Sequence, residues 1–193
     1  RPGPPAHDDL VKRDFTAKGS NQLWLTEITE HWTGQGKVYL CAIKHEWSNR
    51  IVGYSISDRM QARIAVDALK MAVSRRGDVA GCTVHSDRGS QYVSIRYTER
   101  LDQAGIQPSV GSRGDSYDNA LAETINGLYK AELIHRRGPW KTRESVELAT
   151  LQWVHWFNHV RLLTPIGGIP PAEAEANYWR QLAASDTSTE VST

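Results

Sequence analysis

Two carboxylate residues, Asp87 and Glu123, stand at positions where a strand ends and where a later helix is predicted. Asp87 follows the strand-like run 81–86 and precedes the turn-forming residues 88–90. Glu123 lies in a stretch whose apolar residues recur at helical spacing. Paired carboxylates in such places can hold a divalent cation against a phosphodiester. The pair therefore indicates a candidate enzyme that cuts nucleic acid, although each residue alone is more commonly a solvated surface group.

Glu27 is the third carboxylate that such a site requires. It lies in the strand-like run 22–29, where alternation places Leu23, Leu25 and Glu27 on one face. Burying a carboxylate without a partner is costly. Two carboxylates about 4 Å apart repel by about 4 kcal/mol at an effective dielectric of about 20. Three of them therefore converge only where a cation or protons neutralise them.

The predicted helix around Glu123 has a polar face that suits DNA. Asn119, Glu123, Asn126 and Lys130 share this side, with Gly127 among them. A glycine in mid-helix costs about 1 kcal/mol relative to alanine. Its presence indicates close approach of another group, such as a DNA backbone.

Basic residues gather after this helix, although the net charge of +1 does not by itself indicate nucleic-acid binding. The run 130–143 holds Arg136 and Arg137 and contains few acids. Such a run can neutralise phosphates, with binding that weakens as salt rises. A solvated helix end is the alternative interpretation, and Arg113 in the glycine- and serine-rich loop 111–117 has the same two interpretations.

The remaining pattern predicts strands that alternate with helices. Strands are expected at 22–29, 37–44, 50–57, 82–86 and 105–110. Helices are expected from a Ser57–Asp58 cap to about residue 75, at 94–104, and after Thr142. The short connections favour a meander of the first three strands, with the apolar second strand central. Pro108 places the last strand at a sheet edge.

Four segments together carry a specific pattern: QLWLTEIT at 22–29, HSDRGSQY at 85–92, GSRGDSYDNALAE at 111–123, and PPAE at 170–173. In combination they resemble the catalytic half of bacterial insertion-sequence transposases with a retroviral-integrase-like core. The resemblance implies an RNase H-like α/β fold, with a mixed five-stranded sheet flanked by helices. It also implies an Asp-Asp-Glu (DDE) triad whose second and third members correspond to Asp87 and Glu123, followed by a basic residue at Lys130.

The first triad position differs, because this chain has Glu27 where the family pattern has Asp. Glutamate is longer by one methylene, whereas catalytic geometry is held to about 0.5 Å. Two weaker departures are His45, where Asp is usual after the second strand, and Leu163, where an Arg-x-His motif usually ends. Two further interpretations thus stand beside an active transposase: a catalytically inactive remnant that keeps the fold and weak DNA binding, and a plain RNase H-like hydrolase.

The resemblance implies a DDE-type polynucleotidyl transferase that cuts DNA strands and joins their ends. Glu27, Asp87 and Glu123 would be both the catalytic residues and the ligands of two Mg²⁺ ions, with Mn²⁺ as a substitute. Residues expected to contact DNA are Lys130, Asn119, Arg88, Arg113, Arg136 and Arg137. The expected partners are double-stranded DNA of the element ends and the target, and further copies of the chain in a homo-multimer on DNA.

Composition and length suit one domain. With 193 residues, 39% of them hydrophobic, the chain can bury one sizeable core. We expect a linker at 1–16 that leads from a helix-turn-helix region implied by the resemblance, an integrase-like core at 17–180, and a disordered polar tail at 181–193. Cys41 and Cys82 lie in apolar runs and are expected in the core as isolated thiols. No signal peptide or membrane-length apolar stretch is evident, so the cytoplasm is the expected compartment.

Overall fold

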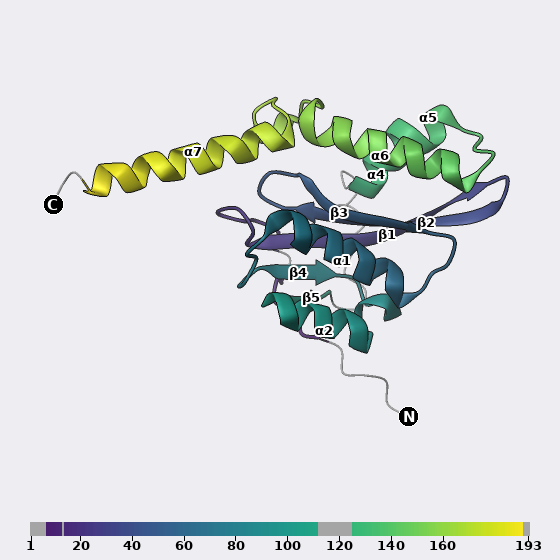
Figure 1. Cartoon of the computed structure of the whole chain (residues 1–193), viewed down its shortest axis with the longest axis horizontal. Helices are drawn as coiled ribbons and strands as arrows, with labels where there is room; N and C mark the ends of the chain where they lie inside the picture. The colour runs from purple at the N-terminus through teal and green to yellow at the C-terminus, as the bar shows by residue number, and fades with distance from the viewer. Residues whose placement is uncertain (1–6, 13, 112–124, 191–193) are drawn as a thin grey trace.

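The computed structural model describes residues 7–12, 14–111 and 125–190, which form one sheet and the helices around it (Figure 1). The strands are β1 (Leu23–Thr33), β2 (Gly36–His45), β3 (Ile51–Ser57), β4 (Thr83–Ser86) and β5 (Gln107–Val110). The helices and helical turns are α1 (Ala62–Arg76), η1 (Ser90–Tyr92), α2 (Ile95–Ala104), α4 (Ile125–Tyr129), η2 (Lys130–Ile134), α5 (His135–Arg137), α6 (Arg143–His159), η3 (Thr164–Ile166) and α7 (Pro171–Glu190).

The sheet has five strands in the order β3-β2-β1-β4-β5 and is mixed. β1, β2 and β3 form an antiparallel meander, whereas β4 and β5 run parallel to β1. This arrangement confirms the predicted mixed sheet, the meander, and the edge position of the strand that contains Pro108. β2 is an interior strand, but the middle one is β1. β1 extends to Thr33 rather than ending near residue 29, because it pairs with β2 along the whole hairpin.

Each face of the sheet has its own buried core. One core lies under α1 and α2 and includes Trp24, Cys41, Leu69 and Leu101. The other lies under the helices from α4 to α6, and its aromatic members are Tyr54, Tyr129, Trp153 and Phe157. Both predicted core cysteines are buried free thiols. Trp153 and Phe157 are core residues as expected, while Trp156 is 41% exposed.

Helix starts follow their capping chemistry. Ser94 caps α2 by accepting a hydrogen bond from the Tyr97 backbone N–H, and Thr142 caps α6 in the same way. The predicted Ser57–Asp58 cap is wrong, because α1 begins after Gln61. Ser57 Oγ instead accepts from the Arg59 backbone N–H, 3.1 Å away, within the preceding turn.

The C-terminal segment is helical over a longer range than its composition indicates. α7 continues to Glu190, whereas the sequence predicts a disordered tail from residue 181. Side-chain hydroxyls donate to carbonyls of the preceding turn, as Ser185 does to Leu182 and Thr187 to Ala183, so these polar residues are compatible with a helix. Residues 191–193 lie outside the described range. None of the helices in the described ranges is long and apolar enough to span a membrane.

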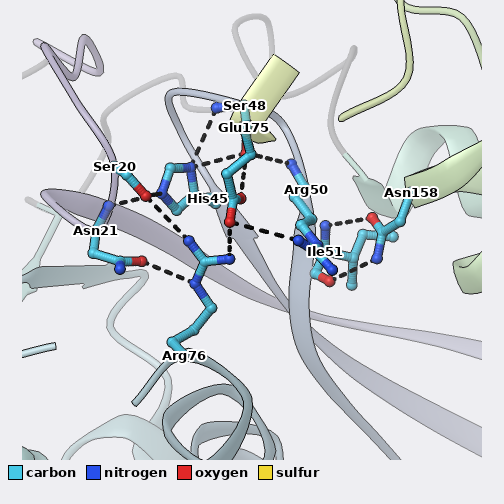
Figure 2. Close-up of polar contacts among 9 residues, drawn as sticks. All are labelled: Ser20, Asn21, His45, Ser48, Arg50, Ile51, Arg76, Asn158 and Glu175. Atoms are coloured by element: carbon cyan, nitrogen blue, oxygen red, sulfur yellow. Dashed lines mark hydrogen bonds and ion pairs between the residues drawn. The ribbon is translucent and has the colours of Figure 1, made fainter. Parts of the chain in front are cut away.

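A buried polar network anchors α7 to the sheet (Figure 2). Glu175 of α7 is 6% exposed and forms an ion pair with Arg76 of α1. Arg50 lies 3.5 Å from the same carboxylate, and Ser48 Oγ donates to it across 3.4 Å. Because each charge of this group has an opposite charge or a hydrogen bond, these contacts offset part of the desolvation cost of burying it.

His45 occupies the centre of the same network as a neutral ring. It is fully buried, and the backbone N–H groups of Asn21 and Ser48 point at its Nε2 and Nδ1 from 2.7 and 3.2 Å, so a doubly protonated ring would face two donors. Its Nδ1 lies 3.0 Å from Ser48 Oγ, which in turn donates to Glu175. Burial, together with the charge of Arg76, lowers the pKa of His45 to about 4. A neutral ring at this position adds no second negative charge beside Glu175.

We predict that this histidine makes stability depend on pH. Its pKa is about 4 when folded and 6.5 when exposed, so the unfolded chain binds more protons between these values. The free energy of unfolding should therefore fall on acidification, by about 2 kcal/mol between about pH 7 and pH 5 for this one group. Urea unfolding of the wild type and of His45→Gln measures the difference.

The variant should show a shallower pH dependence, although His31, whose pKa is also lowered to about 4, keeps part of it. His155→Gln is the control, because His155 is exposed on α6 and should leave the dependence unchanged. An equally steep decline in His45→Gln and wild type would contradict the assigned neutral ring.

Candidate active site

The pairing of β1 with β4 places Glu27 beside Asp87. The two strands are parallel, and Leu23 pairs with Thr83 as Leu25 pairs with His85. Continuing this register by two residues sets Asp87, just past the end of β4, next to Glu27 in the middle of β1. Glu27 is half-buried and Asp87 is exposed. The structure therefore brings together two of the three predicted carboxylates, at the end of the sheet where β4 terminates.

A buried thiol lies near both carboxylates. Cys41 lies in β2, opposite Ile28 of β1. Burial raises the pKa of Cys41 to about 11, and the negative charges of Asp87 and Glu27 act in the same direction. Both carboxylates are therefore near enough to the same thiol to act on it electrostatically.

The turn after β4 orients the Asp87 carboxylate. The Gly89 backbone N–H donates to Asp87 Oδ1 across 2.9 Å. A Cβ atom at position 89 would lie 3.0 Å from that oxygen and 2.8 Å from Oε1 of Gln91. A larger residue here would push these two side chains aside, whereas glycine lets the turn hold the exposed carboxylate of Asp87 close to its own backbone N–H.

Tyr92 connects this turn to β1. The sequence pattern did not identify this residue. Its ring is buried, and its hydroxyl lies 3.3 Å from Oγ1 of Thr26, the neighbour of Glu27. Burial raises the pKa of Tyr92 well above its usual value, so the phenol stays protonated and can donate. The available signal was a large aromatic residue directly after the polar run 87–91.

Arg88, a predicted DNA contact, has an internal partner. Its Nε donates to the Gly111 carbonyl across 3.1 Å, and the Gly111 N–H donates to the Ser86 carbonyl across 3.0 Å. These bonds connect the ends of β4 and β5. Arg88 thus contributes to the shape of the site, and contact with DNA stays a prediction for it.

Three of the predicted residues, Arg113, Asn119 and Glu123, lie outside the described residues. The described helix that follows them, α4, buries Ile125 and Tyr129 and leaves the predicted polar positions Asn126 and Gly127 half-buried. Its Tyr129 ring lies 5.7 Å from the ring of His31. His31 is four residues after Glu27 in β1, so alternation puts both on one face of the strand. α4 therefore packs on the same side of the sheet as Glu27.

Lys130 lies near this face as well. It opens η2, a π-helical turn, and is half-buried. Burial lowers the pKa of His31 to about 4, and the positive charges of Lys130 and His135 contribute to the shift. Arg136 and Arg137 lie one turn further along, exposed, with the Arg137 guanidinium 5.6 Å from the centre of the Trp140 ring. The structure thus places Lys130 near His31, on the face of β1 that carries Glu27.

The donor set suits a hard divalent cation. Glu27 and Asp87 offer carboxylate oxygens, which Mg²⁺ and Mn²⁺ prefer, and two neighbouring carboxylates repel unless a cation lies between them. In the described ranges no three histidine, cysteine, aspartate or glutamate side chains are grouped closely enough to hold a metal ion. The third predicted ligand, Glu123, falls outside those ranges.

Comparison with known proteins agrees with this geometry. Residues 17–116 match the Integrase core domain family, and residues 104–171 match a second family of the same description. A transposase of the insertion sequence element IS629 from Shigella sonnei is 49% identical over 181 residues, which cover 94% of this chain. The chain spans 60% of the length of that relative.

Solved structures show the same fold. The catalytic core of BIV integrase matches with a TM-score of 0.62 at 21% identity, over 86% of this chain and 98% of the other. The HTLV-2 integrase catalytic core, solved in complex with magnesium, matches with a TM-score of 0.57 at 14% identity, over 83% of this chain and 98% of the other. These likenesses show the RNase H-like fold. The chain therefore belongs to the integrase core domain family, and it is similar to insertion-sequence transposases within it.

Proposed function

We propose that this chain is the catalytic domain of a DNA transposase that cuts DNA strands and transfers their ends. The observation that carries the proposal is the placement of Glu27 beside Asp87 by the pairing of β1 with β4 in an integrase core. The similarity to the IS629 transposase supports the choice of DNA as the substrate. Glu123 is proposed as the third member of a DDE-type triad, in which Glu27 takes the first position.

Each residue has a role that its surroundings support. Two magnesium ions, with manganese as a substitute, would supply charge that activates the attacking oxygen and stabilises the leaving one. Glu27 projects from the middle strand of the sheet, so its backbone is rigid. Asp87 is exposed to the substrate and oriented by Gly89. Tyr92 keeps the turn of Asp87 against β1 and acts as a positioning residue.

The proposed DNA contacts lie around these carboxylates. Lys130 would bind a phosphate near the cut, because it lies near the sheet face that carries Glu27. Further contacts are proposed for Arg88, Arg113, Asn119, Arg136 and Arg137. Element ends and target DNA are the proposed partners, and assembly of several copies is proposed from the dimeric form of the HTLV-2 core. The cytoplasm is the proposed compartment.

The contacts around Asp87 support an active enzyme over an inactive remnant. The Asp87 turn has its oriented carboxylate, and Tyr92 has its contact with Thr26. The longer side chain of Glu27 is the feature that an activity measurement must address.

We predict that Asp87→Asn lowers DNA cleavage by at least about 100-fold, because it removes a metal-binding charge and keeps the shape of the side chain. The measurement is strand cleavage of a labelled duplex that carries the element end, with magnesium or manganese, by the full-length protein. Asp186→Asn, an exposed change on α7, is the control. Cleavage by Asp87→Asn at the wild-type rate would refute the assigned site.

We also predict that Glu27→Asp raises cleavage by about 10-fold or more, since the shorter side chain restores the usual first member of the triad. Glu30→Asp is the matched control, because Glu30 is exposed on the opposite face of β1, where it pairs with Lys37 across 2.9 Å. Equal or lower activity in Glu27→Asp would mean that the local backbone has adapted to glutamate.

Tyr92→Phe tests the positioning role of the phenol. Loss of its contact with Thr26 should reduce the free energy of unfolding by about 1 kcal/mol and lower kcat while KM for DNA stays constant. Tyr97→Phe is a matched control: its ring is also buried and packs on Tyr92, but its hydroxyl has no hydrogen-bond partner within the described structure. Equal kcat in the two variants would exclude a positioning role for Tyr92.

A further inference from the structure

A charged groove lies between α1 and α2, on the sheet face opposite to α4 and α6. Its volume is about 380 Å³. The charged side chains that line it are four cations, Arg63, Lys70, Arg96 and Arg100, and two carboxylates, Asp67 and Glu99. The cations come from two helices separated along the chain, so they form no basic run in the sequence, and only the fold brings them together.

Most of these cations have no acidic partner. Arg63 pairs with Asp67 at 3.4 Å, one helical turn away, and both side chains are largely exposed. Lys70, Arg96 and Arg100 form no ion pair with any residue that the structure describes. Because the whole chain has a net charge of only +1, this surplus of positive charge is a local feature and not the result of a generally basic surface.

The groove opens at the same end of the sheet as the carboxylates. β3 and β4 are both parallel to β1, and α1 follows β3 as α2 follows β4. Each helix therefore begins at the end of the sheet where β4 terminates, and the two pack side by side (Figure 1). Arg63 and Arg96 lie in the first turns of α1 and α2, where the helix dipoles add positive potential. The part of the groove that holds Arg63 and Arg96 therefore lies toward the end of the sheet where β4 ends.

Two members of the basic run after α4 already have internal contacts. Arg143 lies 3.4 Å from Asp58 and donates to the Gln35 carbonyl across 2.7 Å, and Arg137 packs on Trp140. Lys70, Arg96 and Arg100 are held by no comparable contact within the described part of the chain. They are thus available to neutralise an external anion.

We propose that the groove between α1 and α2 binds the sugar-phosphate backbone of duplex DNA that extends from the cut, without regard to base sequence. The proposal rests on the proposed function, because that function makes DNA the substrate. Arg96 and Arg100 stand one helical turn apart on α2, and Lys70 faces them from α1, so the three can contact phosphates along one strand. Contacts of this kind fix the path of DNA and carry no sequence information.

The test is binding of this chain to a labelled duplex of arbitrary sequence, measured by fluorescence anisotropy without divalent metal, so that no strand is cut. The groove variant carries Lys70→Ala, Arg96→Ala and Arg100→Ala. The control variant carries Lys12→Ala, Lys18→Ala and Arg180→Ala, which removes the same charge from exposed positions elsewhere. Affinity is recorded between about 50 and 200 mM salt.

We expect the slope of log affinity against log salt to become shallower by about 2 to 3 in the groove variant, because each lost phosphate contact contributes about 0.9. The control variant should keep the wild-type slope. Arg96→Gln alone, at an exposed position, should lower the slope by about 1, which keeps the test valid if the triple variant does not fold. Equal slopes in the groove and control variants would overturn the proposal. The same result would be expected if the groove binds an acidic protein and not DNA.

Cleavage of the end duplex with magnesium separates this result from the proposed function. If the wild type cleaves the duplex but the groove variant keeps the wild-type slope, the groove proposal is contradicted and the proposed function stands. A wild type that binds duplex DNA with the expected slope difference but never cuts contradicts the proposed function, and the groove assignment stands.

Discussion

The parallel pairing of β1 with β4 is the constraint on which the site depends. It holds Glu27, in β1, next to Asp87, which lies just past the end of β4, so the paired strands limit how far the carboxylates can separate to relieve their repulsion. The sheet and its two cores therefore supply the rigidity, and a bound cation would supply the charge that makes the arrangement favourable. Gly89 and Tyr92 refine this placement from the turn after β4.

Around this centre, the elements divide their work between the two faces of the sheet. The face that bears Glu27 carries α4 and the π-helical turn of Lys130. The opposite face carries α1 and α2, whose groove collects cations without acidic partners. At the far end of α1, Arg76 pairs with Glu175, which anchors α7 through the network of His45. The proposed metal site, the proposed DNA groove and the anchor of the last helix thus use separate parts of one sheet.

The sequence predicted those elements that depend on neighbouring residues. Alternation in β1 set the face of Glu27, Pro108 indicated an edge strand, and Thr142 marked the start of α6. The signal failed at Ser57, where a polar residue forms a turn contact instead of a cap. The four motifs in combination were sufficient to indicate the family.

Features that depend on distant residues were beyond such reasoning. Ser48 and Glu175 are 127 positions apart, and a polar residue in a strand end gives no sign of its partner in a late helix. The same holds for Lys70 and Arg96, which α1 and α2 bring to one groove. Tyr92 looked like an ordinary aromatic residue because its role depends on contact with Thr26 of β1. Roles for Arg113, Asn119 and Glu123 come from the resemblance and stay predictions.

Joint binding of a divalent metal by Glu27 and Asp87 can be tested by paramagnetic broadening of backbone amide NMR signals on titration with manganese, since broadening falls steeply with distance from the ion. If the two carboxylates hold the ion, the signals of Ile28 and Gly89 should be lost at low manganese, while the amides of α7 are unaffected. Broadening centred elsewhere, or none at these two amides, would show that Glu27 and Asp87 do not bind the metal together.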